Sequence, residues 1–241
     1  MPILNTILAS PNNINELKVR PNVERNLLHD SVFFNFMRYA TAKWHYNASS
    51  TFGGEHLLAG TATSVPCGGI ATALKTVFIQ GAGIPAHDLE YITISGYVWT
   101  AWDYPCFDPT VKGNIFTPGD RSYHHGTIFS QHFYLRCGNK FYDPCLNRSY
   151  LARDQAVKER LKKAYEIGTG GNRRKVLVST LANVLFIYQR DIVAQGFQGS
   201  WLMVPATKKD LEKALGAKEY NTELAVRGGQ TEFAKFASTL Q

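Results

Sequence analysis

Cysteine is scarce in this sequence, and long apolar runs are missing. Only four cysteines occur among 241 residues, and none has C-x-x-C spacing. So few cysteines in so long a chain exclude a disulfide scaffold, and the spacing gives no structural zinc site. One structural pair among the three cysteines after residue 100 is the alternative to free thiols, which we expect because no secretory signal is present. The most apolar stretch, 176–187, is interrupted by polar residues and is too short to span a bilayer. We therefore expect no membrane span.

The first residues have no basic head before their short apolar stretch, and no secretory signal follows. We expect synthesis in the cytoplasm, with export by a specialised secretion system if the protein acts elsewhere. The chain is 44% hydrophobic and 12% aromatic, which suits a folded protein with a substantial core. The composition predicts a single domain over residues 1–241, with its core at about 31–150 and a C-terminal extension of helices and strands at 151–241.

Basic residues are in excess and give a net charge of +7. They gather in two stretches, 153–163 and 173–175, for which we favour a solvated helix face with a basic loop, while attraction to an anionic surface is the functional alternative. We find no helix-turn-helix, zinc finger or aromatic RNA-binding signature, so no nucleic-acid partner is expected.

Hydrophobic periodicity and turn residues predict a mixed α+β fold. Residues 1–30 are rich in Asn and Pro and are expected to form an irregular arm, and 96–127 a long surface loop. We expect helices at 31–44, 66–80 and 151–167, with two more starting at Thr207 and near Thr231. Strands are expected at 89–95, 127–137, 140–143 and 200–205, while 176–192 fits either a strand or a helix.

Cys67 stands at the start of the most regular predicted helix. Because Pro66 suits the first helical position, we expect Val65 to cap the helix and Cys67 to be its second residue. The free N–H groups and the positive end of the helix dipole would then favour the ionised, nucleophilic thiolate. Gly68 and Gly69 are costly in a first turn and are predicted to leave room for a substrate backbone. The plain alternative is a small buried cysteine.

His132 lies on the predicted strand 127–137, which turns at Gly138-Asn139 into the return strand. In this register, residue 134 faces 143, so Asp143 lies on the same face as His132 and diagonally adjacent to it. Asp143 could then orient the imidazole of His132, which would take the proton of the Cys67 thiol. The alternatives are a core histidine satisfied by the backbone, and an aspartate that caps the end of a strand.

The stretch 66–87 resembles the nucleophile helix of the transglutaminase-like superfamily, which has Cys at a helix start and a Gly-Ile-Pro-Ala exit into a strand. His132 and Asp143-Pro144 are similar to that family's later strands. The resemblance implies a papain-like α+β core, with the nucleophile helix packed on an antiparallel sheet, a Cys-His-Asp triad and, in this chain, extra C-terminal helices. It covers residues 60–147.

The chain departs from the family pattern in three respects. The gap from Cys67 to His132 is longer than in compact members, and the His132 to Asp143 hairpin is shorter. The upstream oxyanion-hole side chain has no clear match, and Trp44, Asn47 and His56 are candidates without positional support. Among rivals for the triad, His124, His125 and Asp108 rank below His132 and Asp143 because they lack the hairpin geometry. Trp99 and Trp102 either line a substrate groove or pack the loop onto the domain.

These residues predict a cysteine-nucleophile amidohydrolase or acyltransferase of the deamidase, peptidase or transglutaminase type, acting through an acyl-enzyme as a bacterial effector or toxin. A protein or peptide supplies the glutamine side chain or peptide amide. No cofactor and no metal are expected. The alternatives are a cell-wall peptide amidase of papain-like fold, whose basic surface would suit an anionic wall, and a catalytically inactive binding module.

Overall fold

The computed structural model describes residues 2–21, 24–46, 50–101, 126–156, 162–168, 173–181, 184–193, 196–205, 207–215, 226–227 and 238–240. These residues form two compact units. The first contains the described residues up to 94 together with 132–155, and the second contains 95–101, 126–131 and the described residues from 156 onward. Helices and antiparallel strands are both present, which confirms the α+β class.

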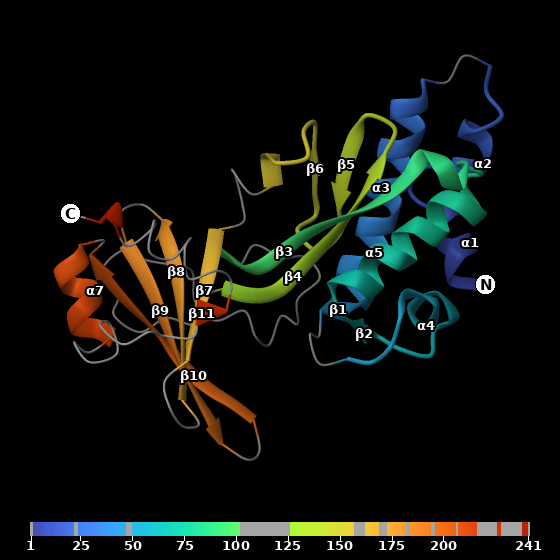
Figure 1. The fold of residues 1–241 in the computed structure, drawn as a ribbon. Coiled ribbons are helices and arrows are strands. Elements are labelled where there is room, and N and C mark those ends of the chain that lie inside the picture. Colours follow the sequence, from blue (N-terminus) through green and yellow to red (C-terminus); the bar gives the residue numbers. More distant parts are fainter. Residues whose placement is uncertain are drawn as a thin grey trace. The chain divides into compact units, whose positions relative to one another are not determined.

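The first unit holds most of the helices (Figure 1). Its α-helices are α1 (Pro2–Ala9), α2 (Ile14–Leu17), α3 (Arg25–Lys43), α4 (Gly54–Ala59) and α5 (Cys67–Thr76). Helix α5 continues into a π-helical turn at Val77–Gly81, and a 3-10 turn follows at Ala86–Asp88. Two short strands, β1 (His45–Tyr46) and β2 (Ser64–Val65), pair in parallel.

The N-terminal arm is helical, so the expected irregular arm over 1–30 is wrong. Leu4, Ile7 and Leu8 of α1 recur at helical spacing and are buried. The Asn-rich segment that suggested an arm instead supplies caps and contacts, since the Asn13 side chain accepts the N–H of Glu16 at the start of α2. Helix α3 begins at Arg25, earlier than the predicted Ser31, so it takes in residues assigned to the arm.

Helices pack on an antiparallel hairpin in this unit. The hairpin consists of β4 (Gly126–Cys137) and β5 (Lys140–Asp143), and β6 (Arg148–Tyr150) extends it. Tyr142 of β5 is fully buried, with its ring centroid 5.1 Å from that of Phe33 on α3 and 5.6 Å from that of Phe78 in the turn after α5. Figure 1 shows α3 beside β5. The helix that carries Cys67 therefore shares one aromatic core with the antiparallel strands.

Strand β3 (Leu89–Ala101) is longer than the predicted strand 89–95, and β4 begins at Gly126. The predicted loop 96–127 is therefore wrong at both ends, while 102–125 lie outside the described residues. The run from Gly96 to Thr100 is rich in aromatic and β-branched residues, and its backbone pairs with a strand of the second unit, with Val98 opposite Lys163.

The second unit is largely an antiparallel sheet. Its strands β7 (Lys162–Gly168), β8 (Arg173–Leu181), β9 (Val184–Val193) and β10 (Gly196–Pro205) pair consecutively, and β11 (Val226–Arg227) pairs with β7. The predicted helix 151–167 is wrong, because 162–168 pair with β8 and long-range pairing overrides a helix-compatible pattern. The ambiguous stretch 176–192 contributes to two strands, β8 and β9.

A helix follows the sheet, α7 (Lys208–Leu215), as predicted from Thr207. The N–H of Asp210 donates to the Thr207 hydroxyl at 3.1 Å, which is the expected cap. The further helix expected near Thr231 falls outside the described residues. None of the helices in the described ranges has the length and apolar character needed to cross a membrane.

Candidate active site

Cys67 is the first residue of α5, directly after a one-residue connection from β2. Pro66 has φ −72° and ψ 173°, and its carbonyl accepts the N–H of Ile70 at 3.1 Å. Pro66 is therefore the N-cap, and the expectation that Cys67 is the second helical residue is wrong by one position, because the extended ψ of Pro66 delays the helix. The N–H of Cys67 is thus among the first-turn donors that α5 itself does not use.

The hairpin that carries His132 and Asp143 has the predicted register. Arg136 faces Phe141 and Cys137 faces Lys140 across the turn, where Gly138 has φ +58°, a left-handed conformation that favours glycine. His132 and Asp143 are joined by a bond of 2.7 Å between Nε2 and Oδ2, and both side chains are fully buried. The diagonal placement expected from the sequence is the one observed.

The Asp143 carboxylate is held at both oxygens. Its Oδ1 accepts the N–H of Leu146 at 3.1 Å, while Oδ2 contacts His132. This buried backbone contact holds the carboxylate in position against Nε2 of the imidazole.

The electrostatics of the pair favour a charged imidazole. Burial lowers the pKa of His132, but the charge and hydrogen bond of Asp143, together with a hydrogen bond to the Cys67 thiol and the charge of that thiol, outweigh burial and raise it. Cys67, only 5% exposed, is therefore a neighbour of His132. The structure brings together the three residues predicted as a triad.

A buried tyrosine that sequence reasoning missed supports the imidazole. Tyr134, fully buried, stacks on His132 with ring centroids 6.1 Å apart and planes at 29°. Its hydroxyl donates to the carbonyl of Arg153. The signal was in the sequence, because residues 132 and 134 share one face of a strand.

The two glycines after Cys67 have different surroundings. A Cβ on Gly69 would lie 2.7 Å from the Val65 side chain, whereas the nearest atom to a Cβ on Gly68 would be 3.6 Å away, on Phe133. Close packing against β2 therefore accounts for Gly69, and its predicted contact with substrate stays a prediction, as it does for Gly68. The side chain of Trp99 and the whole of Trp102 lie outside the part of the chain that is described.

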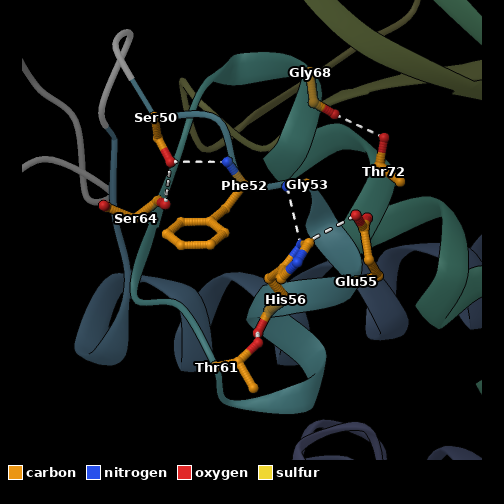
Figure 2. Close-up of polar contacts among 9 residues, drawn as sticks. All are labelled: Ser50, Phe52, Gly53, Glu55, His56, Thr61, Ser64, Gly68 and Thr72. Carbon is orange, nitrogen blue, oxygen red and sulfur yellow. Dashed lines mark hydrogen bonds and ion pairs between the residues drawn. The ribbon is translucent and has the colours of Figure 1, made fainter.

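The segment before α4 is tied to the strand that leads into Cys67 (Figure 2). The Ser50 hydroxyl donates to the Ser64 carbonyl at 2.9 Å and accepts the N–H of Phe52 at 3.2 Å. His56 accepts the N–H of Gly53 through Nδ1 at 3.3 Å, so this oxyanion-hole candidate caps α4.

The other candidates and rivals are placed as follows. Trp44 is 2% exposed, and its ring packs edge-on against Phe36 and Tyr39 of α3. Residues outside the described ranges are Asn47, His124, His125 and Asp108.

Tyr46 is a second residue near Cys67 that the sequence did not indicate. Burial, followed by the charges of Cys145 and Cys67, raises the pKa of Tyr46 well above its usual value, so its hydroxyl lies within electrostatic reach of both thiols. A strand of two residues has no periodicity, so only the pairing of β1 with β2 could reveal this neighbour.

None of the described cysteines, Cys67, Cys137 and Cys145, forms a disulfide. Within the described ranges, no group of three or more His, Cys, Asp or Glu side chains is arranged to hold a metal ion. Comparison of the chain with protein-family models, curated proteins and solved structures found no match.

Proposed function

We propose that the protein is a thiol-dependent acyl-transfer enzyme that attacks amide carbonyls with Cys67. The observation that carries this proposal is the buried 2.7 Å bond between His132 Nε2 and Asp143 Oδ2, beside a cysteine at a helix start. With Nε2 directed at Asp143, Nδ1 is the ring nitrogen left to exchange a proton with the thiol. A nucleophile, a base and a group that orients the base are the parts that acyl transfer requires.

Each side chain has one role in the proposed reaction. The Cys67 thiol gives its proton to His132, and the sulfur forms a bond to the substrate carbonyl carbon. The tetrahedral intermediate collapses to an acyl-enzyme when His132 returns the proton to the leaving amine. Asp143 holds the imidazole in place and stabilises its charged form throughout. Water then resolves the acyl-enzyme in deamidation or proteolysis, and an amine resolves it in transamidation.

The finer fold assignment belongs to the same proposal. A nucleophile at the start of a helix, packed with a hairpin that carries the base and its carboxylate, supports a transglutaminase-like, papain-like core. A glutamine side chain or a peptide amide of a protein is then the substrate class, and we favour hydrolysis. An effector that deamidates or cleaves a host protein is one form that such an enzyme takes.

The proposal is tested by following the thiols with two reagents. p-Nitrophenyl acetate should release a burst of p-nitrophenolate and leave an acetyl group on Cys67, and iodoacetamide should alkylate Cys67 before the other cysteines. Cys137 is a sharp internal control, because burial raises its pKa to about 12 and keeps it protonated and slow.

Two variants separate catalysis from general reactivity. His132→Ala should abolish the burst, whereas His29→Ala removes another buried histidine of the same unit and should keep it. If Cys67 reacts no faster than Cys137 and Cys145 in the wild-type protein, the triad is not functional and a binding role replaces it.

A further inference from the structure

A thiol that attacks a carbonyl creates an oxyanion, which needs hydrogen-bond donors already in place. The N–H of Cys67, at the first position of α5, offers one donor. The second donor is not evident from the sequence. The short parallel pair of β1 and β2 indicates where the second donor lies, because it brings a segment remote in sequence beside the start of α5.

The register places the Tyr46 side chain on the side of the β1–β2 pair where α5 begins. Tyr46 faces Val65 in the parallel pair, and residues that face each other across strands project from the same side of a sheet. The Val65 side chain reaches Gly69, since a Cβ on that glycine would lie 2.7 Å from it. The Tyr46 side chain therefore leaves β1 on the side where the first turn of α5 lies.

Electrostatics agree with this placement. Burial is the largest cause that raises the pKa of Tyr46, followed by the charges of Cys145 and Cys67, so its hydroxyl lies near both thiols and stays protonated across the ordinary pH range. A phenol that stays protonated near a nucleophilic sulfur is a donor at every pH where the triad works. The backbone of β1 is fixed as well, since the N–H of His45 donates to the carbonyl of Thr63 at 2.8 Å.

We propose that the Tyr46 hydroxyl, together with the N–H of Cys67, donates a hydrogen bond to the oxyanion formed when Cys67 attacks the substrate carbonyl. This inference rests on the proposed function. As the sulfur–carbon bond forms, the π electron pair of the carbonyl moves onto oxygen, which accepts both hydrogen bonds. As the intermediate collapses, the pair returns to the C=O bond and the leaving group departs with the proton from His132. Tyr46 keeps its own proton throughout.

The test compares two reactions of one sulfur. Acylation by p-nitrophenyl acetate passes through an oxyanion, whereas alkylation by iodoacetamide displaces iodide and forms none. Tyr46→Phe should slow acylation of Cys67 by about 10²–10³-fold, the effect of removing one oxyanion donor, and leave the alkylation rate unchanged. Tyr91→Phe is the matched control, because it removes a hydroxyl that donates to Thr72 on the second turn of α5 and should change neither rate.

Three outcomes overturn the inference. Equal losses in both reactions, with an unchanged melting temperature, would mean that Tyr46 positions the sulfur. No loss in either reaction would remove Tyr46 from the site. Absence of Cys67 acylation in the wild-type protein would defeat the proposed function itself, a result distinguishable from a wild-type burst that Tyr46→Phe leaves intact.

Discussion

Asp143→Asn separates the two roles open to this carboxylate, which are to orient the imidazole of His132 or only to cap the end of β5. Asp143 accepts at both oxygens, from Leu146 N–H at 3.1 Å and toward His132 Nε2 at 2.7 Å. An asparagine has one acceptor oxygen, so its amide nitrogen must face one of these partners. If it faces Leu146, two donors meet in a buried position. If it faces His132, Nε2 must accept and the ring proton moves to Nδ1, on the side of the thiol.

The free-energy cost of each orientation of the asparagine amide decides which one the protein adopts. An unsatisfied N–H at Leu146 would cost about 1–3 kcal/mol of folding free energy. The tautomer of His132 with its proton on Nδ1 avoids that cost, but Nδ1 can then no longer accept the proton of Cys67. In a serine protease triad, the same loss of the base lowers kcat by about 10⁴. We therefore expect acylation of Cys67 to fall by about 10⁴-fold. The free energy of unfolding should fall by about 1.5–3 kcal/mol through loss of the charged hydrogen bond.

The assay pairs p-nitrophenyl acetate kinetics with urea unfolding. Asp30→Asn is the matched control, because the Asp30 carboxylate also has two partners, Lys140 Nζ at 2.7 Å and the Tyr142 hydroxyl at 2.8 Å. It should lose stability and retain acylation. If Asp143→Asn is destabilised but acylates at the wild-type rate, Asp143 only caps the end of β5, and the argument for a triad fails.

Three further predictions concern stability. The raised pKa of His132 means that its contribution is complete below pH about 6.5 and is lost as pH rises through the folded pKa. The advantage of wild type over His132→Gln in urea unfolding should therefore shrink above that pH, and a constant difference would contradict the linkage. His29 has the opposite sign, because burial lowers its pKa, so acid destabilises wild type below pH about 6.5 and His29→Gln should remove that loss. Gly54→Ala would place a Cβ 2.3 Å from the Ala73 nitrogen and should cost about 1–3 kcal/mol by calorimetry, whereas Gly68→Ala, 3.6 Å from its nearest neighbour, should cost nothing.

The placement of the triad could be predicted because its signals are local. Gly138 fixes the turn, the turn fixes the register, and the register places His132 and Asp143 on one face. Pro66 likewise marks the start of the nucleophile helix to within one residue.

The features that the sequence did not predict depend on partners remote in sequence. The strand 162–168 was expected to be helical, and its state is decided by pairing with β8. Tyr46 lies near Cys67 because two-residue strands pair in parallel, and strands this short show no hydrophobic periodicity in the sequence.

The single residue between β2 and α5 restricts how this protein could diversify. Because Pro66 alone connects β2 to α5, an insertion or deletion there would turn the helix start away from the hairpin that carries His132. Variation in substrate choice must therefore arise from substitutions and from changes in loop length elsewhere. Among natural variants of this sequence, we expect length differences in surface loops and a constant spacing from Ser64 to Cys67.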